Sequence, residues 1–192
     1  MKRIYLVLLI VFLSLSCKST TEPIADKPTD SILPMKVGNY WVMQSTYYDT
    51  LGNITSILQD TIHVIREQIV LGTRYSVVLD KQEEIYYVNR NDGLYALSGN
   101  GQEVLILKYP ASPGDSYFIP SVYIAVISTD TLVSVPKGNL HCYHYFMWNT
   151  SGNCYPVDDY YSPGIGYVQI EVNYNYSSKV LVRRKLVDYF LK

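Results

Sequence analysis

The sequence predicts an all-β fold, an antiparallel meander of about nine to ten strands curled into a half-barrel or barrel, with a sandwich as the alternative. Three observations support this prediction. Short runs dense in Val, Ile, Leu, Thr and Tyr alternate with turns that contain Gly, Pro, Asn or Asp. No long stretch sustains apolar residues at the i, i+3, i+4, i+7 spacing of an amphipathic helix. Tyr, a strand-favouring residue, occurs 20 times, against 4 Phe and 2 Trp.

The expected strands follow one another from residue 40 to the C-terminus, each bounded by a turn signal. The first two form a hairpin around residues 49–53. Asp92 and Gly93 predict another hairpin, because Gly accepts a positive φ. In order, the expected strands are 40–48, 54–66, 74–79, 85–90, 94–97, 104–109, 123–135, 140–148, 167–172 and 179–190.

The overall composition indicates one folded domain. The chain is 48% hydrophobic and 17% charged, so it can bury a core and is not a disordered chain. Its net charge of -1 provides no field that would attract a phosphate backbone. Nucleic acid is therefore not expected as a partner.

The N-terminal residues have the order of an export signal. Lys2 and Arg3 precede an apolar run at residues 4–13, which ends before Ser16 and Cys17. A run of this length is shorter than the roughly 20 residues that a membrane-spanning helix needs. Residues 1–16 are therefore predicted to be a signal peptide. Its removal deletes two basic residues and no acidic ones, which leaves the mature chain mildly acidic.

Cys17 follows a small residue at the end of this run, an order that resembles the lipobox of bacterial lipoproteins. The resemblance implies cleavage before Cys17 and its acylation, with palmitate among the acyl groups. Ser14 departs from the usual Leu of that pattern, and an ordinary secretory signal is the alternative. Lys18 is not the Asp that often retains lipoproteins at the inner membrane. The resemblance therefore implies a lipid anchor in the outer membrane, on its periplasmic or cell-surface side.

The segment after the Cys is expected to be a tether. Residues 17–34 are rich in Ser, Thr, Asp and Pro and show no periodic apolar pattern. The single β domain is expected to span residues 35–192.

Three local patterns resemble uncharacterised envelope lipoproteins from Bacteroidota-like bacteria. They are LPMKVGNYW at 33–41, VPKGNLHC at 135–142 and YSPGIGYV at 161–168. The resemblance covers most of residues 33–172 and implies a curled antiparallel sheet and an envelope location more than it implies an activity. The Pro and Gly residues of these patterns are expected to shape turns.

The search for catalytic and metal-binding patterns finds no candidate. Of His63, His141 and His144, only the last shares a strand face with Cys142, and a zinc site would need further ligands. We therefore expect no catalytic residue, no cofactor and no metal, and a protein that is not an enzyme. Two adjacent acidic pairs, Glu83-Glu84 and Asp158-Asp159, are expected to be solvated turn residues.

Cys142 and Cys154 remain once Cys17 is acylated. An even number of cysteines in an exported chain predicts a disulfide between them, and the turn at residues 149–153 could bring the two together. Two separate buried thiols are the alternative.

The abundant tyrosines leave two binding functions open. Inward-facing tyrosines would line a core or cavity, whereas outward-facing ones would form a platform for sugars. The preferred hypothesis is an outer-membrane lipoprotein that binds an apolar ligand or lipidated partner in a concave sheet. The alternative is an aromatic-faced, glycan-binding surface lipoprotein, and Tyr as ordinary sheet filler is the simplest explanation of the composition. The sequence does not indicate an oligomeric state.

Overall fold

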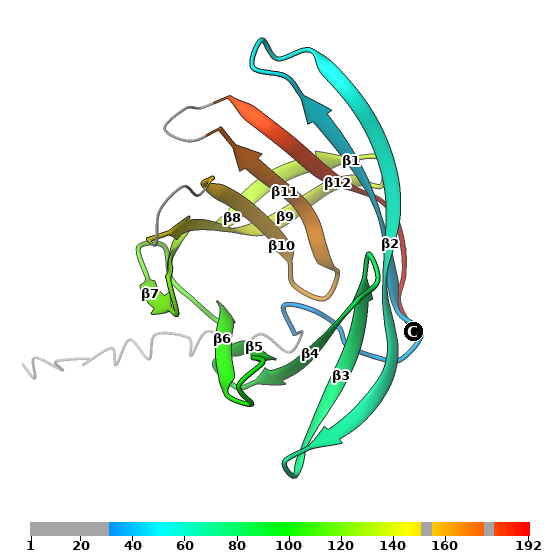
Figure 1. The fold of residues 1–192 in the computed structure, drawn as a ribbon, viewed down its shortest axis with the longest axis vertical. Helices are drawn as coiled ribbons and strands as arrows, with labels where there is room; N and C mark the ends of the chain where they lie inside the picture. The colour runs from blue at the N-terminus through cyan, green and yellow to red at the C-terminus, as the bar shows by residue number, and fades with distance from the viewer. Residues whose placement is uncertain (1–30, 151–154, 175–178) are drawn as a thin grey trace, which may run out of the picture.

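The computed structural model describes residues 31–150, 155–174 and 179–192. These residues form one 12-stranded antiparallel sheet that curls into a nearly closed barrel, which confirms the predicted fold class (Figure 1). The signal segment 1–16 and Cys17 lie outside the described residues. None of the described residues belongs to a helix that is long and apolar enough to cross a bilayer.

The strands form a meander in which the first and last strands are also hydrogen-bonded neighbours. Its strands are β1 (Tyr40–Tyr48), β2 (Ile54–Val70), β3 (Thr73–Asp80), β4 (Glu83–Arg90), β5 (Gly93–Leu97), β6 (Glu103–Lys108), β7 (Ser116–Ile119), β8 (Val122–Val135), β9 (Gly138–Asn149), β10 (Val157–Ser162), β11 (Gly166–Asn173) and β12 (Val180–Phe190). The first strand pairs with the last, so β6 and β7 become the two edges of the sheet. Strand β2 is long enough to pair with β1 through its first half and with β3 through its second.

Two strands of the structure are absent from the sequence prediction. Strand β7 has only four residues, and β10 contains the Asp158-Asp159 pair that was expected in a solvated turn. That expectation is wrong for Asp159, which is buried in the middle of its strand. The pair Glu83-Glu84 does follow a turn and is exposed, at the start of β4.

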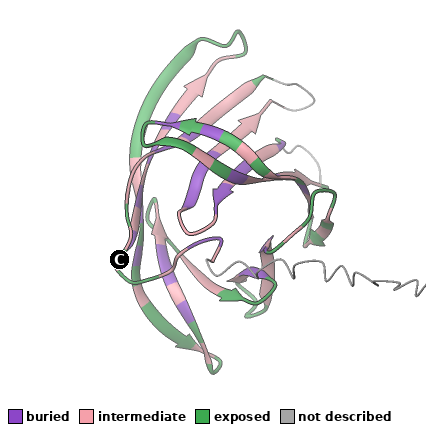
Figure 2. Cartoon of the chain, turned by 180° about the vertical axis from the view of Figure 1, so that it is seen from behind, coloured by how far each residue is buried: buried purple, intermediate pink, exposed green. Residues whose placement is uncertain are grey.

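The N-terminal segment fills one end of the barrel. Ile32 and Leu33 are buried, so the packed domain begins before Met35, within the expected tether. Asn89 donates a hydrogen bond to the Leu33 carbonyl at 2.9 Å, and Ser76 donates to the Met35 carbonyl at 3.0 Å. Buried residues accordingly gather inside the curled sheet, while both ends of β2 are exposed (Figure 2).

A sharp corner between β10 and β11 packs against this segment. Gly164 and Gly166 both have positive φ, of 76° and 97°, which confirms that this Pro-Gly pattern shapes a turn. Trp41 is fully buried beside the corner and donates its indole N–H to the Ile165 carbonyl at 2.5 Å.

The far end of the β8–β9 hairpin forms a small second layer. It packs across the outer face of β12, where Lys137 pairs with Asp188 at 2.6 Å and Lys185 donates to the Ser134 carbonyl at 3.4 Å. This arm buries Cys142 and covers part of the face opposite the barrel interior.

Candidate functional site

The strand register places a row of apolar side chains along one rim of the barrel. Residues directly opposite one another in antiparallel strands point to the same face, so the row can be followed from strand to strand. We call it the apolar row, and its members in spatial order are Ile124, Met147, Val157, Val172, Val182 and Tyr47. Each member lies close to an end of its strand.

The apolar row is incompletely covered. Ile124 is buried and Met147 packs against the core, but Val157, Val172 and Val182 are only half-buried and are not part of the core cluster. Because these valines occupy three neighbouring strands, they form a continuous apolar strip that retains contact with solvent. This strip is the part of the inner face that an apolar molecule could still cover.

The next row toward the core contains buried charged groups. We call it the mixed row, and its members are Val126, Tyr145, Asp159, Ile170, Arg184, Ser45 and Leu58. Asp159 lies two residues after Val157, and Arg184 lies two residues after Val182. Each pair is therefore separated along its strand by only about 6.6 Å.

Arg184 is the centre of an ion-pair cluster on the inner face. Its guanidinium donates to Asp80 at 2.7 and 3.0 Å and to Asp60 at 2.7 Å. Burial alone would lower the pKa of Arg184, but the bonds to Asp80 and Asp60 outweigh it and raise that pKa. Lys81 adds a longer contact of 3.8 Å to Asp60, and the Nε of Arg184 has no hydrogen-bond partner in the part of the chain that the structure describes.

Asp159 is the most unusual group of this face. Only 7% of the residue is exposed, and one carboxylate oxygen accepts a hydrogen bond from Tyr161 at 3.2 Å. The other oxygen, Oδ1, has no hydrogen-bond partner among the described residues. Burial raises the pKa of Asp159 from its ordinary value of 3.8 to about 7, and hydrogen bonds from the Tyr161 hydroxyl and the Tyr160 amide, with the charge of Arg184, compensate only in part. The carboxyl is therefore about half ionised near neutral pH.

Tyrosine side chains surround Asp159 from four strands. The members of this shell are Tyr87, Tyr145, Tyr161 and Tyr167. Burial raises the pKa of each of them, so their hydroxyls stay neutral and can only donate or accept hydrogen bonds. Tyr145, Tyr161 and Tyr167 belong to the packed core of the barrel interior, and Tyr87 packs against it.

The outer face of the sheet carries stacked aromatic side chains. His144 pairs with Asp158 at 2.7 Å and stacks on Tyr160 with the ring centroids 4.4 Å apart. Tyr40 stacks on Phe190 at 5.8 Å, on strands β1 and β12. Tyr40 lies on β1 and His144 on β9, so these aromatic groups come from separate strands that are not neighbours in the sheet.

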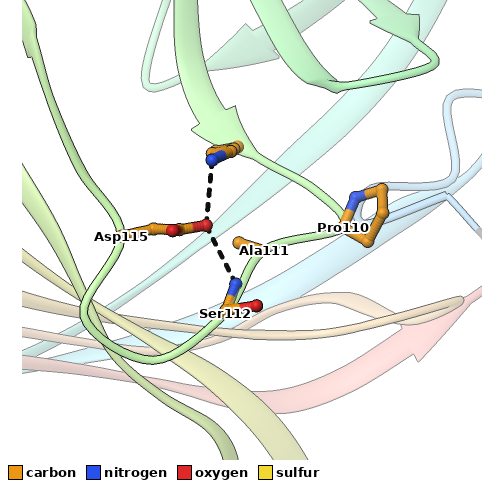
Figure 3. Close-up of a pocket in the computed structure, with 5 residues that line it drawn as sticks. Pro110, Ala111, Ser112 and Asp115 are labelled. Carbon is orange, nitrogen blue, oxygen red and sulfur yellow. Dashed lines mark hydrogen bonds and ion pairs between the residues drawn. The ribbon is translucent and has the colours of Figure 1, made fainter.

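A surface pocket of about 390 Å³ lies where the chain passes from β6 to β7 (Figure 3). Its charged groups already have partners, since Asp115 pairs with Lys108 at 2.9 Å and accepts from the Ser112 amide at 3.0 Å. The backbone bond from Ser112 and the contact with Lys108 lower the pKa of Asp115. We therefore place the candidate site on the inner face and not in this pocket.

The residues singled out by the sequence are dispersed in the structure. Cys142 is buried on β9 and forms no disulfide with another described residue, and Cys154 lies outside the described residues. His141 is exposed beside Asp130 on β9, whereas His63 lies on another strand, β2. Among the described residues, no three His, Cys, Asp or Glu side chains converge as metal ligands.

Comparison with known proteins identifies the fold. No family model and no curated protein matches the chain. The structure is similar to that of an exported protein with a YmcC-like fold from Bacteroides fragilis, with a TM-score of 0.52 and 15% identity over 84% of this chain and 100% of that one. This chain has a YmcC-like fold. A protein described as a lipoprotein from Parabacteroides distasonis has a TM-score of 0.49 and 16% identity, over 84% of this chain and 99% of that one.

The local sequence around Asp159 does not single it out as a site residue. Asp159 is adjacent to another acid and lies near a Pro-Gly turn, which is the usual setting of solvated carboxylates. The alternation of Val157, Asp159 and Tyr161 on one side of a strand was the available signal. An acid between two core-facing residues indicates an inward-pointing carboxylate.

Proposed function

We propose that this YmcC-like barrel is a non-catalytic envelope lipoprotein that holds an apolar ligand, or the acyl chain of a lipidated partner, against its inner face. The observation that carries the proposal is the half-buried strip of Val157, Val172 and Val182. Covering apolar surface is favourable by roughly 25 cal/mol per Å². A flexible acyl chain lying along the apolar row would remove this strip from water without displacing the packed core.

The binding experiment uses the full chain with Cys17→Ser, which cannot be acylated, and the neutral fluorescent probe N-phenyl-1-naphthylamine. We expect saturable binding that envelope lipid extract competes away. Val172→Asn places a polar group in the apolar row and should weaken probe binding at least tenfold. Leu132→Asn, at an exposed apolar position on the β8–β9 arm, is the matched control and should bind like the parent.

The outer-membrane anchor rests on the order of residues 2–18 alone. Mass spectrometry of the membrane fraction should find an N-terminal peptide that begins with acylated Cys17. A soluble mature product with an unmodified N-terminus would contradict the lipid anchor. It would not bear on the proposal of apolar binding.

The glycan-binding alternative has weaker support, because the outer-face aromatic pairs are separate. A glycan array would favour it if hits disappear in Tyr160→Ala or Tyr40→Ala while the apolar probe fails to bind. The Cys142–Cys154 disulfide also stays a proposal. Alkylation of the Cys17→Ser chain under denaturing, non-reducing conditions tests it, since a bridged chain takes up no label and an unbridged chain takes up two.

A further inference from the structure

The polar groups behind the apolar strip restrict the kind of ligand that fits, if the proposed function holds. A chain that lies along the apolar row passes Val157 and Val172. Asp159 lies two residues after Val157 on the same strand, about 6.6 Å away. Asp159 is more than nine-tenths buried, and its Oδ1 has no hydrogen-bond partner within residues 31–150, 155–174 and 179–192. A buried carboxylate oxygen without a hydrogen-bond partner is complementary to a ligand group that donates a hydrogen bond.

The charges of the inner face determine the sign of that ligand. Three carboxylates, from Asp60, Asp80 and Asp159, face two cations, Arg184 and Lys81. The two cations contact Asp60 and Asp80, whereas Asp159 forms no ion pair among the described residues. An additional cation would therefore favour the ionised form of Asp159, whereas an additional anion would favour its protonated form.

We propose that the inner face binds an amphiphile with a primary ammonium headgroup, whose apolar chain lies on the apolar row and whose N–H groups donate to Oδ1 of Asp159. A charge-assisted hydrogen bond of this kind is stronger than a neutral one. A carboxylate or phosphate headgroup in the same place would face Asp159 with a like charge. A hydroxyl headgroup could donate to Oδ1 but would leave the negative charge without a counter-ion.

The first test needs no substitution on the inner face. Decylamine, decanol and decanoate, all kept below their micelle concentrations, compete with N-phenyl-1-naphthylamine for the full Cys17→Ser chain. We expect decylamine to displace the probe at a concentration at least tenfold lower than either of the other two. Equal potency of the three compounds, or a preference for decanoate, would overturn the headgroup assignment and leave apolar binding in place. Absence of probe binding would overturn the proposed function itself.

A second test assigns the preference to Asp159. In Asp159→Asn the ratio of decylamine potency to decanol potency should fall to near one, because the amide cannot supply a negative charge. Asp115→Asn, at a carboxylate of the surface pocket, should keep the parent ratio. If Asp159→Asn keeps the tenfold ratio, the ammonium is bound elsewhere and the assignment is wrong. Far-ultraviolet circular dichroism identifies an unfolded variant, in which case Asp159→Ser replaces it.

Discussion

The hydroxyl of Tyr117 on β7 binds the backbone of Lys108 on β6 and so connects the two edges of the sheet. It accepts a hydrogen bond from the Lys108 amide at 3.1 Å and donates one to the Ile106 carbonyl at 2.9 Å. Tyr145 reaches the same edge and donates to the Lys108 carbonyl at 2.8 Å. Tyrosine hydroxyls thus form hydrogen bonds with backbone groups of β6 that would otherwise bond to a neighbouring strand. Burial raises the pKa of Tyr117 to about 12, so its hydroxyl keeps the proton that it donates.

Removing the Tyr117 hydroxyl should therefore loosen the barrel. Tyr117→Phe leaves the Lys108 amide and the Ile106 carbonyl without this partner, and we expect a loss of about 2 kcal/mol in the free energy of unfolding. Urea denaturation measures the change. Tyr123→Phe, on the outer face of β8, is the control and should change stability by less than about 0.5 kcal/mol. Equal stability of the two variants would show that the hydroxyl does not hold the edges together.

The corner at Gly166 should be intolerant of any side chain. A Cβ there would collide with Leu33 Cδ1 and lie 3.2 Å from the Trp41 ring, at a φ of 97° that L-residues rarely adopt. We expect Gly166→Ala to destabilise the protein by about 3 kcal/mol, through overpacking and backbone strain together. Gly52→Ala has a similar φ of 89° but open space around it, and should cost about 1 kcal/mol. Similar costs at both positions would contradict the packing of residues 31–35 against this corner.

Asp159 should make the ligand-free protein less stable as the pH rises. Its folded pKa of about 7 lies above its ordinary value of 3.8, so its contribution is fully present below pH 4 and is lost as the pH rises through 7. A shift of this size corresponds to about 4 kcal/mol. The free energy of unfolding of the parent should therefore fall, relative to that of Asp159→Asn, between pH 4 and pH 7. Parallel pH profiles would show that the carboxyl is not held in an apolar setting. Asp130→Asn, at an exposed acid, should follow the parent profile.

Cys142 should be chemically inert in the folded protein. It is fully buried, and burial raises the pKa of its thiol to about 12, so almost no thiolate forms at neutral pH. In a chain with Cys17→Ser and Cys154→Ser, we expect no labelling by Ellman's reagent until denaturant is added, and one labelled thiol afterwards. Rapid labelling without denaturant would mean that the β8–β9 arm does not cover this face.

Local sequence signals predict most of this fold, because strand propensity and turn chemistry act over a few residues. Ten of the strands could be recognised in this way, from 40–48 to the C-terminal one. Strand β7 is too short to show alternation. Strand β10 was not predicted because the adjacent Asp158 and Asp159 interrupt the apolar-polar alternation that marks a strand. The burial of Leu33 depends on the shape of a corner more than 120 residues away.

The site was less predictable than the fold, because it depends on register. The apolar row exists only because β1 pairs with β12 and because each hairpin aligns one valine with the next. The contact between Arg184 and Asp60 spans most of the chain. Neither relationship leaves a local motif in the sequence.

The most direct measurement of apolar binding on the inner face is methyl NMR with a nitroxide-labelled alkyl chain. In the Cys17→Ser chain with labelled Val, Leu and Met methyl groups, the nitroxide broadens the resonances that lie near the bound chain. We predict saturable broadening at Val157, Val172 and Val182, with no effect at the exposed Leu71 and Leu132. Broadening only at the exposed leucines, or none at any concentration, would contradict binding on the inner face.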